Sequence, residues 1–500
     1  MAVFVCLGAI ISTDAIGLEA FPKPGILFVN MPAPSAHPVN GRARVPAPLL
    51  KRRLPSGRGA TEQPNAAGDG DAALTARFWV ALVMTGVAAG LFGAFMMYVL
   101  FNVEHLAFNF SHGSFQDAVE RSSNLRRITS LLVAAAIGGP AWYLLRRYTP
   151  GEKSEVDDAI WTGDGRVSFR RCLGTGLISE LVIGMGASIG RENAPKLMGA
   201  ASGTVVSGWL GLTGGQRKLL VACGAGAGLG AVYNVPLGGA LFTVEVLLGT
   251  AFLPAVLPAL ACSFIATLTS WVYLPARATY VDIPAYRFTA TLMICALLIG
   301  PVVGLLASGY IRLIGWVSFH RTSGIKLVPA MFVAFGALGL IGFAYPQLFG
   351  NGQDMAHDAF IGQGTLLLFL ALSMLKPLVT AACLKSGAAG GLFTPTLSTG
   401  AAFGALSGLV WSHFWPGSPA GAFAMVAAAA MVGASMQAPL AALALVLELT
   451  HSGFSLVVPM MAATVIATLV ARHVDGYSIY SARLPARQSA ALSPVITSPT

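Results

Sequence analysis

Charged residues are scarce in this chain of 500 amino acids. Asp, Glu, Lys and Arg together make up 10% of the sequence, against about 25% in a typical soluble domain. This low share excludes the soluble multi-domain protein that a chain of this length would otherwise suggest. Apolar residues make up 55% of the chain, which indicates that its solvent is mostly lipid.

Cysteine is also rare, and its six positions show no paired spacing. Most of them lie in apolar segments, so we expect reduced packing residues rather than disulfide partners. The eight histidines are scattered, and no cluster of His, Cys and Asp or nucleophile–base pair is recognisable, which argues against an enzyme. We expect no metal and no cofactor.

The net charge of +10 is distributed over loops and tails rather than over one module. Basic pairs lie outside the apolar runs or at their edges, as the positive-inside rule and interfacial anchoring require. No basic module is long enough to bind nucleic acid, so we expect no nucleic-acid partner.

Seven apolar runs approach the roughly 20 residues that a helix needs to cross a bilayer. They cover residues 79–100, 128–145, 251–271, 292–309, 327–344, 365–382 and 456–471. Two shorter segments, 186–200 and 390–404, are interrupted by glycine or proline. Broken helices are tolerated at membrane depth only where they face protein or a wet cavity, so these two segments point to a substrate site.

An internal repeat divides the chain. Residues 230–245 recur as residues 433–448 at an offset of 203, with Gly-Ala, an amide residue, Pro-Leu and Glu in common. Residues 190–195 are matched by 390–395 at an offset of 200. Two motifs in the same order at nearly the same separation indicate two homologous halves.

We expect three regions along the chain. Residues 1–75 are predicted to be a disordered tail or an over-extended start. Residues 76–485 form the transmembrane transport domain, with halves of about 76–280 and 285–485, and residues 486–500 form a second tail. The glycine-rich run at 224–230 is interpreted as close helix packing, because it lacks the strand and the acidic residue of a dinucleotide-binding fingerprint.

The first chemical motif is Gly-Ala-Ser-Ile-Gly-Arg-Glu-Asn-Ala-Pro at 186–195. A glycine-rich break before a helix leaves free backbone N–H groups at the positive end of the helix dipole, where an anion binds. We expect Arg191, Asn193 and Ala194 to contribute to this anion site. The carboxylate of Glu192 can occupy the same site and act as a gate, or it can merely complement the dipole.

The second motif, Gly-Ala-Ala-Gly-Gly-Leu-Phe-Thr-Pro at 387–395, repeats this construction. In an inverted repeat the two helix starts face each other near the midplane, so the N–H groups of Leu392 and Phe393 become candidate anion ligands. Simple packing through small residues is the alternative. Tyr480 offers a neutral hydroxyl donor for a partly dehydrated anion, or serves as an interfacial anchor.

In combination, these motifs resemble the CLC family of chloride channels and proton/chloride antiporters. They are GRENAP (190–195), NVPLGGALFTVE (234–245), GGLFTP (390–395) and SIYSARL (478–484). The resemblance covers about residues 80–484, and within the family it is to the bacterial ClcB-like branch. It implies an all-α membrane protein with two inverted-topology repeats and about eighteen tilted and broken helices. It also implies a homodimer with one pore per subunit in the bacterial inner membrane.

Three departures from the family pattern matter. Asn193 replaces the glycine after the gating Glu, and the proline comes one residue late. The family's Gly-Ser-Gly-Ile-Pro loop, whose serine hydroxyl helps to select the central anion, is not recognisable in this chain. The nearest counterpart is residues 150–154, in which Gly151 takes the position of that serine. The antiporters' second proton-accepting Glu corresponds to Val246, which cannot relay a proton. These residues favour a passive, Glu192-gated chloride channel sensitive to voltage and pH over a proton-coupled antiporter. An unrelated inverted-repeat transporter or a membrane enzyme is a third hypothesis.

Four further charged residues lie within apolar surroundings. Glu245 and Glu448 occupy equivalent repeat positions, and we expect structural hydrogen bonds from both. Lys376 and Lys385 precede the second anion motif. They either raise the local positive potential or extend to an interface.

Overall fold

A computed structural model of the chain describes residues 74–110, 113–152, 155–417 and 419–484. The predicted tails therefore lie outside the described residues, except for positions 74 and 75. Within the described part the structure consists of 17 α-helices joined by loops and short helical turns. This confirms the all-α prediction.

The helices are as follows. In the first half of the chain they are α2 (Ala76–Phe108), α3 (Phe115–Arg121), α4 (Asn124–Tyr148), α5 (Val156–Trp161), α6 (Phe169–Gly184), α7 (Asn193–Trp209), α8 (Gly214–Tyr233), α9 (Pro236–Leu241), the π-helix η1 (Phe242–Leu248) and α10 (Leu253–Ser270). In the second half they are α11 (Ala290–Phe319), η2 (Gly324–Lys326), α12 (Leu327–Ile341), η3 (Pro346–Leu348), α13 (Gln353–Ile361), α14 (Leu366–Lys385), α15 (Phe393–Phe414), α16 (Ala420–Met436), α17 (Pro439–Thr450), η4 (Phe454–Leu456), α18 (Val457–Val474) and η5 (Ser481–Arg483).

Seven helical segments of the described chain are long and apolar enough to cross a membrane. They are Ala76–Phe108, Asn124–Tyr148, Leu253–Ser270, Ala290–Phe319, Gly324–Ile341, Leu366–Lys385 and Phe454–Val474. Each contains most of one predicted apolar run, so all seven predictions are confirmed. The first span begins at Ala76 and is preceded by the N-cap Thr75, whose hydroxyl accepts the N–H of Phe78 at 3.3 Å.

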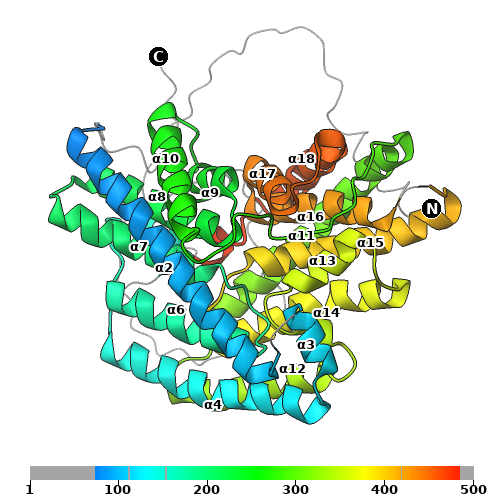
Figure 1. The fold of residues 1–500 in the computed structure, drawn as a ribbon, viewed down its shortest axis with the longest axis horizontal. Coiled ribbons are helices and arrows are strands. Elements are labelled where there is room, and N and C mark those ends of the chain that lie inside the picture. Colours follow the sequence, from blue (N-terminus) through cyan, green and yellow to red (C-terminus); the bar gives the residue numbers. More distant parts are fainter. Residues whose placement is uncertain (1–73, 111–112, 153–154, 418, 485–500) are drawn as a thin grey trace, which may run out of the picture. The chain divides into compact units, whose positions relative to one another are not determined.

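The remaining helices are shorter and more buried, and they pack closely through small residues. α7 and α8 lie together against α2, which also contacts α6 and α10 (Figure 1). A Cβ at Gly199 of α7 would overlap the carbonyl oxygen of Gly224 in α8, and a Cβ at Gly228 would overlap that of Pro195. The glycine-rich run at 224–230 is therefore a helix-packing surface, as predicted.

The repeated segments adopt the same backbone conformation. α8 ends at Asn234 and α16 ends at Gln437, both left-handed, with φ of 54° and 55°. A proline then starts α9 and α17 at Pro236 and Pro439. Recurrence of this unusual corner at the predicted offset supports the interpretation of two homologous halves.

Glu245 and Glu448 cap each other's repeat. The Glu245 carboxylate accepts the N–H groups of Leu440 and Ala441 at 3.2 and 2.7 Å, at the start of α17. The Glu448 carboxylate accepts those of Leu237 and Gly238 at 3.0 and 2.6 Å, at the start of α9. Each carboxylate satisfies N–H groups that have no partner within their own helix, so both glutamates are structural, as predicted.

Candidate anion site

The two predicted anion motifs meet in space. Each begins at a glycine with positive φ, Gly186 at 110° and Gly387 at 108°. The loops then pair through an antiparallel bridge, in which Gly190 and Gly391 exchange N–H···O bonds of 2.9 and 2.7 Å. α7 starts three residues after Gly190 and α15 starts two residues after Gly391. Two helix starts from different halves are thereby fixed next to one another.

The carboxylate of Glu192 lies at the start of the opposite helix. Glu192 precedes α7, is 3% exposed, and accepts the N–H of Phe393 at 2.7 Å on its Oε1 atom. A side chain at Gly190 or Gly391 would overlap this carboxylate. The arrangement places a negative group on the free N–H groups and positive dipole end of α15.

Two hydroxyl groups that the sequence reasoning missed complete the contacts of Glu192. Its Oε2 atom lies 3.2 Å from Thr394 Oγ1 and 3.3 Å from the Tyr233 hydroxyl, and these two hydroxyls are 2.6 Å apart. The Tyr233 ring packs edge-on against Phe393, with ring centroids 5.8 Å apart. Thr394 lies inside the motif at 390–395, and Tyr233 lies in the repeated segment 230–245, directly before the motif at 234–245. Their convergence needed the fold, because 161 positions separate them.

The other predicted anion ligands near Glu192 lie at the starts of α7 and α15 and differ in how deeply they are buried. Leu392 caps α15 and is 2% exposed, while Ala194 is fully buried and Asn193 half-buried in the first turn of α7. The backbone N–H groups of Asn193 and Ala194 have no protein acceptor among the described residues. Such N–H groups at a helix start are available to an anion.

The side chain of Arg191 points to a neighbouring cavity. Its guanidinium lies 5.1 Å from the centroid of the Tyr233 ring and 5.9 Å from that of Phe101. The cavity has a volume of about 400 Å³, and its polar lining includes Glu104 and Asp354 beside Arg191. Arg191 therefore supplies positive charge next to Glu192 without a hydrogen bond to its carboxylate.

Tyr480 and Gly151 have contrasting positions. Tyr480 is 6% exposed, and the neighbouring Ile479 N–H donates to the Ser435 carbonyl at 2.7 Å, which fixes this segment against α16. The ammonium of Lys196 lies 5.1 Å from the centroid of the Tyr480 ring. Gly151 is exposed, and no described residue lies within 4 Å of the position that its Cβ would take. The structure does not bring Gly151 to the other candidate ligands.

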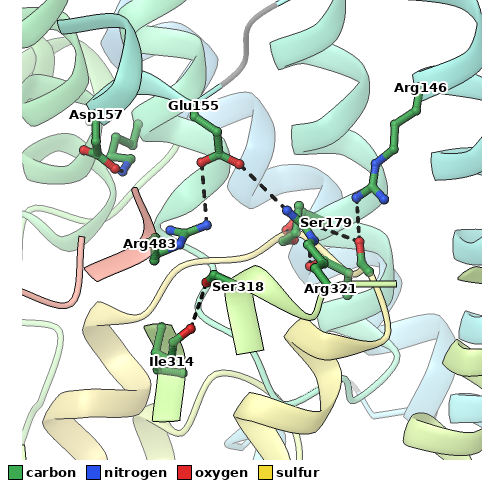
Figure 2. A network of polar contacts seen from close by, with 12 residues as sticks. Arg146, Glu155, Asp157, Ser179, Ile314, Ser318, Arg321 and Arg483 are labelled. Carbon is green, nitrogen blue, oxygen red and sulfur yellow. Dashed lines mark hydrogen bonds and ion pairs between the residues drawn. The ribbon is translucent and has the colours of Figure 1, made fainter. Parts of the chain in front are cut away.

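A cluster of arginines holds the loop that leads into α15. Arg146 donates to the Gly387 carbonyl at 2.6 Å, and Arg321 donates to the Gly387 and Ala388 carbonyls at 3.0 and 2.8 Å. Figure 2 shows Glu155 between Arg321 and Arg483, at 3.8 and 3.6 Å. Partial desolvation by the surrounding protein raises the pKa of Glu155, but the guanidinium groups of Arg483 and Arg321 outweigh this effect, so this pKa lies below its ordinary value.

Lys376 is fully buried rather than extended to an interface. Its ammonium donates to Ser188 Oγ at 2.9 Å and to the carbonyls of Leu348 and Gly350 at 3.3 and 2.9 Å. These contacts satisfy all three N–H donors and fix the loop before Glu192. Lys385, by contrast, is exposed, and its ammonium lies 4.4 Å from the centroid of the Trp316 ring.

The fold and the site together define a multi-pass helical membrane protein of the ion-transport class, whose polar centre is formed by two helix starts. A family model described as voltage-gated chloride channel matches residues 130–472, more than half of the chain. The chain therefore belongs to this family, the CLC family, which is a transport family rather than an enzyme family.

Curated relatives and solved structures agree with this assignment. The voltage-gated ClC-type chloride channel ClcB of Citrobacter koseri is 28% identical over 420 residues, which cover 79% of this chain and 96% of that protein. The ClcB of Escherichia coli is 29% identical over 424 residues, covering 81% and 97%. These bacterial relatives agree with the predicted inner-membrane location.

Two solved structures share the fold. A slow cyanobacterial Cl⁻/H⁺ antiporter superposes with a TM-score of 0.72 at 21% identity, over 85% of this chain and all of that one. A CLC-type fluoride/proton antiporter gives a TM-score of 0.67 at 20% identity, over 81% of this chain and 97% of that one. At these identities the likeness establishes the fold, which confirms the predicted CLC architecture.

Proposed function

We propose that this protein is a passive chloride channel, sensitive to pH and voltage, whose gate is the carboxylate of Glu192. The observation that carries the proposal is the bond from the Phe393 N–H to Glu192 Oε1 at 2.7 Å. A helix N-terminus binds small anions through such N–H groups, so the carboxylate and a chloride ion compete for one position. Seated, the carboxylate blocks the path; protonated or swung away, it leaves the N–H group to the anion.

Passive transport is supported by the residue that follows Glu245. Val246 lies in the π-helix η1 and is fully buried. A valine neither binds nor releases a proton, so this position cannot deliver protons from the inner side to Glu192. The ClcB relatives, described as chloride channels, support the same mode.

A proton-coupled antiporter is the second candidate, and one buried acid favours it. Glu180 of α6 is fully buried, and neither of its carboxylate oxygens has a hydrogen-bond partner among the described residues. It interacts electrostatically with Arg191 and Glu192. An acid in this position could exchange a proton with Glu192. The two solved structures that share the fold are described as antiporters, which also favours this candidate.

Chloride and proton fluxes measured together distinguish the two modes. The full chain is reconstituted in liposomes, and an outward chloride gradient is imposed while internal pH is followed. The channel predicts chloride flux without proton movement, and a reversal potential that a pH gradient does not shift. Uphill proton movement driven by chloride, abolished by Glu180→Gln with chloride flux retained, would establish the antiporter instead.

We also propose a homodimer with one pore per subunit, as the family resemblance implies. Light scattering of the detergent-solubilised protein should give twice the chain mass of 51.7 kDa. A mass of one chain, with chloride flux retained after reconstitution at one chain per vesicle, would contradict the dimer.

A further inference from the structure

A second buried charge lies in the first turn of α7. Lys196 is four residues after Glu192, and its backbone N–H donates to the Glu192 carbonyl at 3.2 Å. Its side chain is 8% exposed and forms an ion pair with Asp157 of α5, with Nζ and Oδ2 3.3 Å apart. A buried ammonium group therefore lies one helical turn after Glu192 on the same helix.

This ion pair lies against Tyr480. The ammonium of Lys196 is 5.1 Å from the centroid of the Tyr480 ring, and Tyr480 interacts electrostatically with both Asp157 and Glu192. Asp157 itself lies beside the Glu155 network (Figure 2). The pair thus lies close to a candidate anion ligand on one side and to the arginine cluster on the other.

The hydrogen bonding of the pair is incomplete. An ammonium has three N–H donors, and Asp157 is the one hydrogen-bond acceptor of Lys196 among the described residues. The Oδ1 atom of Asp157 is buried and has no hydrogen-bond partner in the described part of the chain. A buried ion pair is stabilising only when its geometry is good and further hydrogen bonds satisfy the remaining groups. The buried ammonium of Lys376 has three acceptors for its three donors, although it is in no ion pair with a described residue, whereas that of Lys196 has one.

We propose that Lys196 binds the permeating anion beside Tyr480, and that Asp157 is a competing counter-ion which chloride displaces. The unused donors of Lys196 supply the anion's hydrogen bonds, and its charge compensates the cost of moving chloride out of water. The proposal rests on the proposed anion path through Glu192. It adds a residue that sets chloride affinity, separate from the carboxylate that gates the path.

Removing the positive charge of Lys196 and removing the negative charge of Asp157 should change chloride affinity in opposite directions. Chloride binding to the detergent-solubilised full chain is measured by calorimetric titration. Lys196→Met should weaken binding at least about tenfold, since a hydrogen bond to a charged group is lost. Asp157→Asn should strengthen binding by about tenfold, because the competing carboxylate is removed. The double variant should bind chloride as weakly as Lys196→Met.

A matched control uses an ion pair elsewhere. Asp475, at the C-cap of α18, has a side chain that is 4% exposed and pairs with Arg312 of α11 at 2.7 Å. Asp475→Asn should leave chloride affinity within about twofold of the wild type, because this pair has no hydrogen bond or ion pair with Lys196, Tyr480 or Glu192 in the described structure.

The proposal is overturned if Lys196→Met and Asp157→Asn shift chloride affinity in the same direction, or leave it within about twofold. It is also overturned if both single variants lose thermal stability and the double variant regains it at constant affinity, since a structural ion pair behaves in this way. Failure of the proposed function is a separate result, namely a wild-type chain that neither binds nor conducts chloride.

Discussion

Removing the two hydroxyls beside Glu192 should reveal a shared hydrogen bond. Tyr233 and Thr394 have one hydroxyl proton each, yet three contacts link them and Glu192 Oε2. Two protons can serve only two of these contacts. The 2.6 Å contact between the hydroxyls takes one proton, so Oε2 receives one hydrogen bond at a time.

This count predicts how the variants combine. Tyr233→Phe leaves Thr394 to donate to Glu192, and Thr394→Val leaves Tyr233 to donate. Each single variant should therefore change the ratio of closed to open protein by no more than about twofold, equivalent to under about 0.5 kcal/mol. The double variant leaves Oε2 without a donor and loses about 1.5–3 kcal/mol of closed-state stabilisation. Its closed-to-open ratio should fall roughly 10–100-fold.

The assay is the open fraction at one fixed pH, from single-channel recording in planar bilayers. Tyr286→Phe is the matched control, because its hydroxyl donates to the Phe360 carbonyl at 2.6 Å rather than to Glu192. The reasoning is refuted if the two single variants each produce the full effect and their free energies add, since additivity means independent bonds. It is equally refuted if the double variant opens no more often than the wild type.

Three further predictions concern stability. Gly228→Ala should lower the free energy of unfolding by about 1–3 kcal/mol, because its Cβ overlaps the Pro195 carbonyl. Thermal unfolding in detergent measures this, with Gly208→Ala as the control, because the space at its Cβ is open. Equal effects of the two substitutions would contradict the packing account. Glu448→Gln should cost about 1–2 kcal/mol by losing one of two bonds to the start of α9, and an unchanged melting temperature would contradict this cap. Ionised Glu155 stabilises the fold fully above its ordinary pKa of 4.5, and this stabilisation is lost as pH falls through its lower folded pKa. The stability difference between wild type and Glu155→Gln should therefore shrink below pH 4.5, and a difference that grows on acidification would contradict the sign.

The architecture was largely predictable from the sequence. Long apolar runs are a local property, so all seven spans could be read directly from them. The repeat was also local evidence, and it correctly placed Glu245 and Glu448 in equivalent structural positions. The approach of the motifs at 190–195 and 390–395 followed from the expected inverted repeat, and the bridge between Gly190 and Gly391 realises it.

Contacts between side chains from distant segments were not predictable. Nothing in the sequence indicates that Tyr233 and Thr394 reach the Glu192 carboxylate, because their approach depends on how three helix ends are packed. The same holds for Lys196, whose ion pair with Asp157 spans 39 positions. The two interpretations of Lys376 could be separated only by its burial and its three acceptors.

The central claim is that the Glu192 carboxylate occupies an anion site at the start of α15. Its most direct test is chloride efflux from liposomes containing Glu192→Ala, measured across a series of pH values. Without a carboxylate to seat on the Phe393 N–H group, efflux should exceed that of the wild type at neutral pH and lose its pH dependence. A variant that keeps the wild-type closed fraction and the wild-type response to pH would contradict the account.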